Sequence, residues 1–180
     1  AYVGNFRATQ GIDFPGMITD AIRCVRRGAY RHPYKYVLID EYQDMSRPRY
    51  ELIRALREQS DFTLFCVGDD WQSIYRFAGS DIHLILDFAD IWRDWGPTRM
   101  FQITTTRRFR QSLIDASGAF VMQDKSLYAK QLRNPSDKKD YSLKALGGAT
   151  QEERFDAIVE QLRKLPKAAS VLMLGRYRSD

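Results

Sequence analysis

The stretch YVLIDEYQD, Tyr36 to Asp44, joins a short apolar run directly to a group of carboxylates. Its first four residues are apolar or aromatic, which is typical of a short strand buried in a sheet. Asp40 and Glu41 follow at once, and Asp44 lies three residues after Glu41. Adjacent carboxylates repel each other and cost stability unless a cation neutralises them. The stretch therefore predicts a buried strand whose end faces a metal ion.

A second apolar run downstream ends in the same way. The stretch FCVGDDWQSIYRF, Phe65 to Phe77, passes from apolar residues into Gly68, two aspartates, the uncharged amide of Gln72 and then an aromatic and basic cluster. Between the two runs, Pro48 suits the first turn of a helix whose apolar residues recur at helical spacing. Strands separated by helices predict parallel βαβ units, and ligands collect at the carboxyl ends of such strands. The sequence thus predicts one polar site built from both strand ends.

The other predicted elements continue this alternation of helical and strand patterns. We predict helices over residues 12–27 (closed by Gly28), 82–88, 111–122 and 151–165, besides the helix that begins near Pro48. We predict strands over residues 36–39, 62–67, 100–103, 141–146 and 171–174, with a polar loop over residues 134–140. A Gly-Pro pair interrupts the pattern, so a domain boundary is predicted near residues 95–98. The fold class is α/β.

Composition narrows the class of protein. The 180 residues are 44% apolar and 13% aromatic, which predicts a globular chain of one or two small domains. The sequence contains no run of 18 apolar residues and no charged-then-apolar leader, so it predicts a cytoplasmic protein without a membrane span. The net charge of +5 permits a polyanionic partner without requiring one. Cys24 and Cys66 lack a CxxC partner and are predicted to be buried free thiols.

Three motifs resemble those of the superfamily 1 DNA helicases of the UvrD, Rep and PcrA type. VLIDEYQD resembles motif II, the Walker B strand, VGDDWQSIYRFAGSD resembles motif III, and TTTRRFRQSLIDAS resembles motif IV. The Trp after the acidic pair and the Arg-Phe of motif IV are similar to the helicase IV branch of that family. Order and spacing agree, so the resemblance extends from Asp13 to the end of the chain. It implies a RecA-like parallel sheet flanked by helices, in the P-loop NTPase fold.

The resemblance also implies a division into parts of two tandem motor domains. Residues 1–97 correspond to the C-terminal part of domain 1A with motifs II and III, and residues 98–180 to the N-terminal part of domain 2A with motif IV. The Walker A P-loop, GxxxxGK[ST], does not occur in the sequence. The chain begins without Met and ends shortly after an apolar run. We therefore expect a fragment that does not hydrolyse ATP alone, cut from a parent enzyme that does.

The resemblance gives roles to residues around the nucleotide. It implies that Asp40 holds Mg²⁺, that Glu41 activates the hydrolytic water, and that Gln72 contacts the γ-phosphate of ATP. Arg108 is implied to stabilise transition-state charge. Arg107 stands where the family pattern has a Tyr that stacks on adenine. Since a guanidinium is planar and can stack on a π-face, Arg107 is expected to contact the nucleotide as well.

The aromatic cluster of motif III is implied to bind single-stranded DNA. Phe77 resembles the residue on which bases stack, with Tyr75 and Arg76 beside it, and such stacking tolerates any base sequence. The alternative is that Trp71, Tyr75 and Phe77 are core aromatics.

Several polar residues beside these motifs leave two interpretations open. Gln43 and Asp44 either form surface hydrogen bonds that cap the following turn or act directly in the site. His32 and His83 stand alone in the sequence and are expected to be surface or packing residues.

The expected parent is an ATP-dependent 3′–5′ DNA helicase or translocase that uses ATP and Mg²⁺. Its expected partner is single-stranded or tailed duplex DNA, and no protein partner is indicated. Two other functions remain open: a helicase-derived module that binds nucleic acid or protein without ATPase activity, and the motor part of a helicase-nuclease.

Overall fold

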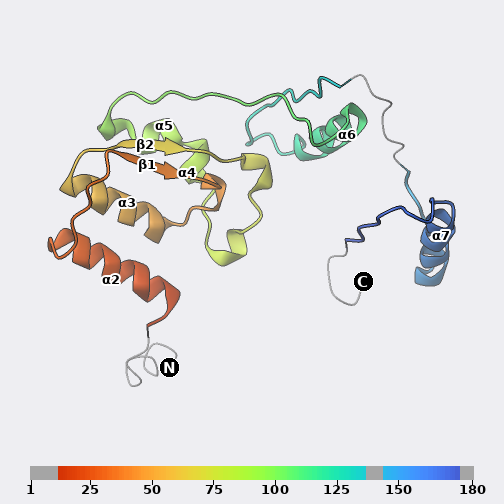
Figure 1. The fold of residues 1–180 in the computed structure, drawn as a ribbon, viewed down its shortest axis with the longest axis horizontal. Helices are drawn as coiled ribbons and strands as arrows, with labels where there is room; N and C mark the ends of the chain where they lie inside the picture. The colour runs from red at the N-terminus through yellow and green to blue at the C-terminus, as the bar shows by residue number, and fades with distance from the viewer. Residues whose placement is uncertain (1–11, 137–143, 175–180) are drawn as a thin grey trace.

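The computed structural model describes residues 12–136 and 144–174. Most of the regular structure lies in the first half of the chain, around a small parallel sheet (Figure 1). The elements are α2 (Phe14–Arg26), β1 (Tyr36–Ile39), α3 (Arg47–Gln59), β2 (Thr63–Cys66), α4 (His83–Leu86), α5 (Phe88–Ile91), α6 (Gln111–Val121) and α7 (Gln151–Arg163). Four short 3-10 helices join them: η1 (Tyr42–Asp44), η2 (Asp70–Gln72), η3 (Arg76–Ala78) and η4 (Arg93–Trp95).

The predicted βαβ unit is confirmed. β1 and β2 pair in parallel, with Tyr36 opposite Thr63 and Ile39 opposite Cys66. α3 connects them, and Pro48 lies in its first turn, where a missing backbone N–H costs nothing. Because the strands are parallel, both of their carboxyl ends point the same way, towards α6 in Figure 1.

The helix predicted over residues 12–27 is confirmed as α2, which packs along α3. The Asp13 side chain caps it by accepting the Gly16 N–H at 2.8 Å, and Gly28 follows its end with a φ of +72°. Cys24 is exposed, so the prediction of a buried thiol is wrong there. The next residue, Val25, is buried instead. Because adjacent helical residues point about 100° apart, Cys24 does not share the buried face.

The core lies between one face of the sheet and the helices. Trp92 and Tyr42 are buried at its centre, where the Trp92 Nε1–H donates to the Tyr42 hydroxyl at 3.0 Å. Burial raises the pKa of the Tyr42 hydroxyl well above its ordinary value, and it raises the pKa of the Cys66 thiol to about 12. The buried apolar members of this core are Tyr42, Met45, Ile53, Phe62, Leu84 and Trp92.

The two histidines are found as expected, His32 packed in the interior and His83 on the surface. His32 is buried, with Nε2 2.9 Å from the Leu56 carbonyl oxygen and its ring edge-on to Phe62. His83 is exposed and lies 3.2 Å from an Asp87 carboxylate oxygen.

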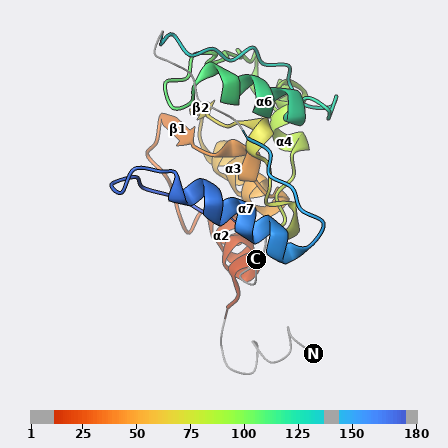
Figure 2. The same ribbon diagram turned by 90° about the vertical axis from the view of Figure 1, so that its right-hand side faces the viewer.

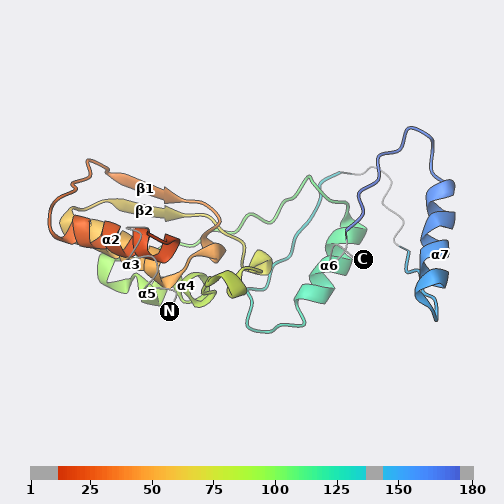
Figure 3. The ribbon, with the colours of Figure 1, turned by 90° about the horizontal axis from the view of Figure 1, so that it is seen from below.

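The opposite face of the sheet is uncovered by the described helices. Figure 3 shows α2, α3, α4 and α5 on one side of β1 and β2. On the other side, Tyr36, Leu38 and Phe65 are exposed, because alternate residues of a strand point to opposite faces. The expected sheet flanked by helices is therefore present on one face.

Two predicted strands do not form. Residues 100–103 and 171–174 carry no strand, and apolar side chains in both segments, such as Ile103 and Leu172, are exposed. Apolar residues favour a strand only where a neighbouring strand pairs with their backbone, and these segments have none among the described residues. Of the strand predicted over 141–146, residues 144–146 are irregular and 141–143 lie outside the described residues. The loop predicted over 134–140 is irregular at 134–136, and its remainder also lies outside them.

The later helices follow the prediction more closely. α6 and α7 form where the helical patterns predict them, whereas the helix predicted over 82–88 is divided into α4 and α5 at Asp87. α7 lies apart from the sheet in Figures 1 and 3, and Figure 2 shows the chain from the α7 side. Among the described helices, none has the length and apolar character needed to cross a membrane.

Candidate functional site

The carboxylates that follow β1 lie in a strained turn. Asp40 Oδ1 accepts the Glu41 backbone N–H at 2.9 Å. Glu41 has a φ of +50°, and it is the one non-glycine residue with a positive φ in the part of the chain that the structure describes. A left-handed conformation costs an L-residue about 1–2 kcal/mol and persists only where the surroundings hold it. Such strain is concentrated at functional sites.

Gln43 joins the ends of the two strands. It is 2% exposed, its Nε2 donates to Glu41 Oε2 at 2.7 Å, and its Oε1 accepts the Asp69 backbone N–H at 2.9 Å. The interpretation of Gln43 as a surface residue is therefore wrong. The residue type was itself a signal, because a side-chain amide can donate to a carboxylate and accept from a backbone N–H at the same time. Its neighbour Asp44 caps nothing through Oδ1, which is buried and has no hydrogen-bond partner among the described residues.

Lys130 pairs with both of the carboxylates that follow β2. Asp70 is 3% exposed, and Lys130 Nζ contacts one of its oxygens and lies 2.5 Å from Asp69 Oδ1. Partial burial alone would raise the pKa of Asp69, but hydrogen bonds from Lys130 and Gln72 outweigh it and hold that pKa below its ordinary value. Sequence reasoning missed Lys130, because no local pattern marks a lysine so far from motif III.

Four of the predicted nucleotide residues line one cleft. Asp40, Glu41, Gln72 and Arg108 lie along a cleft of about 1480 Å³, whose wall also includes β2 and residues 96–104. The Gln72 side chain is held there by Asp69, whose Oδ2 accepts the Gln72 Nε2–H at 2.7 Å. The structure thus brings these four predicted residues to one cavity.

Arg107 lines a neighbouring cavity instead. This cavity, of about 320 Å³, also includes Arg108, which therefore faces both spaces. The Arg108 backbone N–H donates to Thr106 Oγ1 at 3.3 Å.

The predicted DNA-binding residues form an exposed group in and beside η3. Phe77 is 86% exposed, Tyr75 is also exposed, and their ring centroids lie 5.9 Å apart. The alternative of core aromatics is therefore wrong for both. Trp71 is half-buried and lies outside the buried core, and its Nε1–H donates to the Tyr128 carbonyl oxygen at 3.0 Å. Arg76 lies between Tyr75 and Phe77 in the sequence. The segment therefore offers aromatic rings on which bases can stack and a cation that can pair with phosphates.

The residues at the end of β1 fit an Mg²⁺–nucleotide. No group of three or more His, Cys, Asp or Glu side chains suited to a metal occurs among the described residues. Mg²⁺ bound with a nucleotide needs only one or two carboxylates, because phosphates and waters complete its shell. Asp40 is such a carboxylate, since it lines the cleft and forms no ion pair with a described cation. Asp69 and Asp70 already share Lys130 as their cation.

Comparison with known proteins identifies the family. The family model of the UvrD/REP helicase N-terminal domain matches residues 1–91, half of the chain. The chain belongs to the UvrD/Rep helicase family. DNA helicase IV of Escherichia coli K12 is 35% identical over 181 residues, which cover 98% of this chain and 25% of that protein. The ATP-dependent DNA helicase UvrD1 of Mycobacterium tuberculosis H37Rv is 31% identical over 142 residues, covering 73% of this chain and 18% of that protein.

A third relative in the UvrD/Rep family shows the same partial coverage. The ATP-dependent DNA helicase PcrA of Bacillus subtilis 168 is 29% identical over 133 residues, which cover 71% of this chain and 18% of that protein. The chain thus spans a quarter or less of the length of these relatives. The resemblance drawn from motifs II, III and IV is confirmed at the level of the family.

Proposed function

We propose that this chain is part of an ATP-dependent 3′–5′ DNA helicase or translocase that couples Mg²⁺-ATP hydrolysis to movement on single-stranded DNA. The observation that carries the proposal is the common cleft lined by Asp40, Glu41, Gln72 and Arg108. Such a cleft contains four of the groups that phosphoryl transfer to water uses: a metal ligand, a base, a polar contact for the phosphate and a cation for the developing charge. The proposed domains are 1–97 and 98–180, and the proposed compartment is the cytoplasm.

The chemistry follows from the strained turn after β1. Asp40 would hold Mg²⁺, which when bound supplies positive charge to the phosphate oxygens. Glu41 would accept the proton of the attacking water, and Gln43 fixes one of its oxygens at 2.7 Å so that the other is free to face the cleft. Gln72 would contact the terminal phosphate, and Arg108 would stabilise the charge that develops on it. Arg107 would contact the nucleotide from the neighbouring cavity.

Movement requires a second surface that holds DNA without regard to sequence. The exposed rings of Tyr75 and Phe77 provide stacking platforms, and Arg76 provides a cation for the backbone. η3 follows Gln72 by a few residues, so the proposed phosphate contact and the proposed stacking residues share one short segment. Single-stranded and tailed duplex DNA are the proposed substrates.

Two other functions are weighed against this proposal. A module that only binds DNA or protein has no need of a strained glutamate held in a cleft. The motor part of a helicase-nuclease would share every feature described above, so it stays a second possibility for the parent protein.

The deciding experiment replaces Glu41 in the full-length parent. Glu41→Gln keeps the shape of the side chain but cannot accept a proton, so DNA-stimulated ATP hydrolysis should fall about a hundredfold or more while nucleotide affinity stays nearly unchanged. Removal of Mg²⁺ with a chelator should abolish hydrolysis by the unaltered protein. Glu58→Gln is the matched control, because Glu58 is exposed on α3 and its ion-pair partner in the described part of the chain is Arg26, at 3.3 Å. Hydrolysis within tenfold of the unaltered rate would exclude Glu41 as the base.

A further inference from the structure

Lys130 reaches the motif III carboxylates from far along the chain. It lies 61 residues from Asp69 in sequence, and its side chain is 16% exposed. Its Nζ contacts Asp69 and Asp70 together and lies 5.1 Å from the centroid of the Trp71 ring. Three consecutive motif III residues therefore surround one ammonium group. A lysine is rarely buried unless it is paired in this way.

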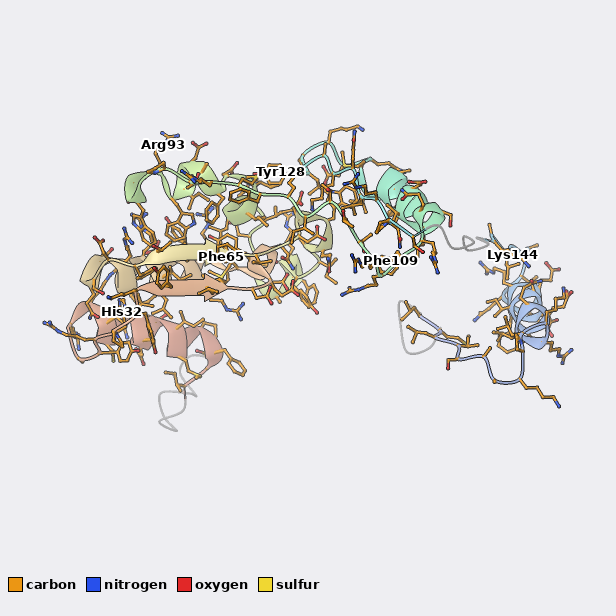
Figure 4. All side chains as sticks on the ribbon, turned by 45° about the horizontal axis from the view of Figure 1, so that its top comes forward. His32, Phe65, Arg93, Phe109, Tyr128 and Lys144 are labelled. Carbon is orange, nitrogen blue, oxygen red and sulfur yellow. The ribbon has the colours of Figure 1, made fainter. Side chains whose placement is uncertain are left out.

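The segment that carries Lys130 is fastened to the same place by its own backbone. The Tyr128 backbone N–H donates to Asp70 Oδ2 at 2.7 Å, and the Tyr128 carbonyl oxygen accepts the Trp71 Nε1–H at 3.0 Å. The Tyr128 hydroxyl donates to the Leu86 carbonyl oxygen at 2.6 Å. Figure 4 shows Tyr128 where the α6 part of the chain meets the part that contains the sheet. Residues 128–130 are thus held at several points.

Through Asp69, Lys130 reaches the proposed phosphate contact. Asp69 Oδ1 accepts from Lys130 at 2.5 Å, and Asp69 Oδ2 accepts from Gln72 Nε2 at 2.7 Å. The carboxylate therefore lies between the ammonium group and the Gln72 amide. Without the lysine, Asp69 has no other ion pair among the described residues. Its Oδ1 would keep only the longer hydrogen bond from the Trp71 backbone N–H at 3.2 Å, so the carboxylate would be held less firmly against Gln72.

The same segment is connected to Arg108. Three residues after Lys130, Arg133 exchanges backbone hydrogen bonds with the first residues of motif IV. The Arg133 N–H donates to the Thr104 carbonyl oxygen at 2.9 Å, and the Thr106 N–H donates to the Arg133 carbonyl oxygen at 2.9 Å. Thr106 in turn accepts the Arg108 backbone N–H. Lys130 therefore lies on a continuous set of contacts between Gln72 and Arg108.

We propose that Lys130 is a positioning residue for ATP hydrolysis: it holds Asp69, and through Asp69 the Gln72 amide, in register with the segment that carries Arg108. The inference rests on the proposed function of the cleft and assigns it a residue outside the three motifs. Lys130 does not itself contact the nucleotide. Its effect on the rate must therefore pass through Gln72, and that dependence can be measured.

The test is a double-mutant cycle in the full-length parent, with the kcat and KM of DNA-stimulated ATP hydrolysis as readouts. Lys130→Met removes the charge at similar length, and Gln72→Ala removes the side chain on which it acts. Lys130→Met should lower kcat at least tenfold, and it should change kcat less than twofold when Gln72 is already Ala. Lys130→Arg, which keeps the charge, should restore most of the rate.

Two further variants separate positioning from folding. Lys125→Met is the matched control, because Lys125 is exposed and, within residues 12–136 and 144–174, donates to the Met122 carbonyl oxygen alone; the kcat of this variant should be unchanged. Lys130→Met leaves Asp70 buried without a cation, so the same kinetics are measured on Lys130→Met/Asp70→Asn, in which the unpaired carboxylate that remains is that of Asp69, whose side chain is 38% exposed to water. That double variant should remain folded and show the same fall in kcat.

The outcomes distinguish this inference from the function on which it rests. An unaltered protein without DNA-stimulated hydrolysis would overturn the proposed function and this inference together. If the unaltered protein is active, then a normal kcat in Lys130→Met/Asp70→Asn overturns the inference alone. Independent, multiplying losses from Lys130→Met and Gln72→Ala would also overturn it, because Lys130 would then act by another route.

Discussion

Gln43 is the residue on which the geometry of the β1 turn depends. Its amide satisfies the Glu41 carboxylate and the Asp69 backbone N–H together, and it does so while buried. The left-handed conformation of Glu41 therefore has an identifiable support. Asp69 also accepts a hydrogen bond from Gln72. Gln43 therefore links Glu41, the proposed base, to Gln72, the proposed phosphate contact, through Asp69.

Replacing Gln43 should weaken both the fold and the site. Gln43→Met keeps the length of the side chain but leaves the Asp69 N–H without its acceptor, which costs about 1–3 kcal/mol. We expect that loss in denaturant unfolding of the full-length protein, together with slower ATP hydrolysis. Gln151→Met, at the exposed first position of α7, is the control and should change neither. Unaltered stability in Gln43→Met would show that water replaces the amide.

At the residue scale, the sequence pattern predicts which residues line the cleft better than it predicts which distant residues pair with them. The motifs predict four site residues, and all four line the cleft: Asp40, Glu41, Gln72 and Arg108. Lys130 was not found, because an ion pair across 61 residues leaves no periodic trace. Cys24 was misplaced because its apolar neighbours do not all share its side of α2.

At the element scale, the strands that formed are those that have a partner. β1 and β2 pair with each other, whereas residues 100–103, which are apolar except for Gln102, line the cleft without pairing. Strand propensity is largely a measure of packing against neighbours, so it cannot by itself decide whether an isolated apolar run becomes a strand. Helices close their own backbone hydrogen bonds, and four predicted helices, α2, α3, α6 and α7, were accordingly found near their predicted bounds.

The connection after β2 leaves no room for a side chain at Gly68. A Cβ there would lie 2.9 Å from Gln43 Oε1 and 3.1 Å from the Gln43 backbone nitrogen. We therefore expect Gly68→Ala to destabilise the full-length protein by about 1–3 kcal/mol, as overpacking does. The measurement is the denaturant midpoint followed by tryptophan fluorescence.

Gly118 provides the opposite control for this substitution. It lies within α6, and a Cβ there would meet only the Trp71 ring at 3.7 Å, an ordinary contact. Gly118→Ala should stabilise by about 0.5–1 kcal/mol, since glycine is unfavourable in a helix interior. Equal effects from the two glycines would contradict the close approach at Gly68.

At the scale of the whole molecule, the cleft contains the groups that are proposed to act on the terminal phosphate and the attacking water. Asp40, Glu41, Gln72 and Arg108 can hold a metal, accept a proton and stabilise charge. A nucleotide also needs a cradle of backbone amides and a lysine around its phosphates, which the P-loop supplies. The 180-residue sequence contains no such segment.

The 180-residue chain alone should therefore hydrolyse no ATP, even though its proposed base is in place. Correct positioning of the reactants supplies a large share of catalysis, and a cleft that cannot grip the phosphates cannot provide it. The measurement is phosphate release by the purified chain with Mg²⁺ and single-stranded DNA, beside the full-length protein as the positive control. Turnover should stay below ~1 per second, the low end of ordinary enzymes. A higher rate that disappears in Glu41→Gln would contradict the prediction, because the activity would then belong to this chain, and the phosphate-binding groups would have to be sought among its own residues.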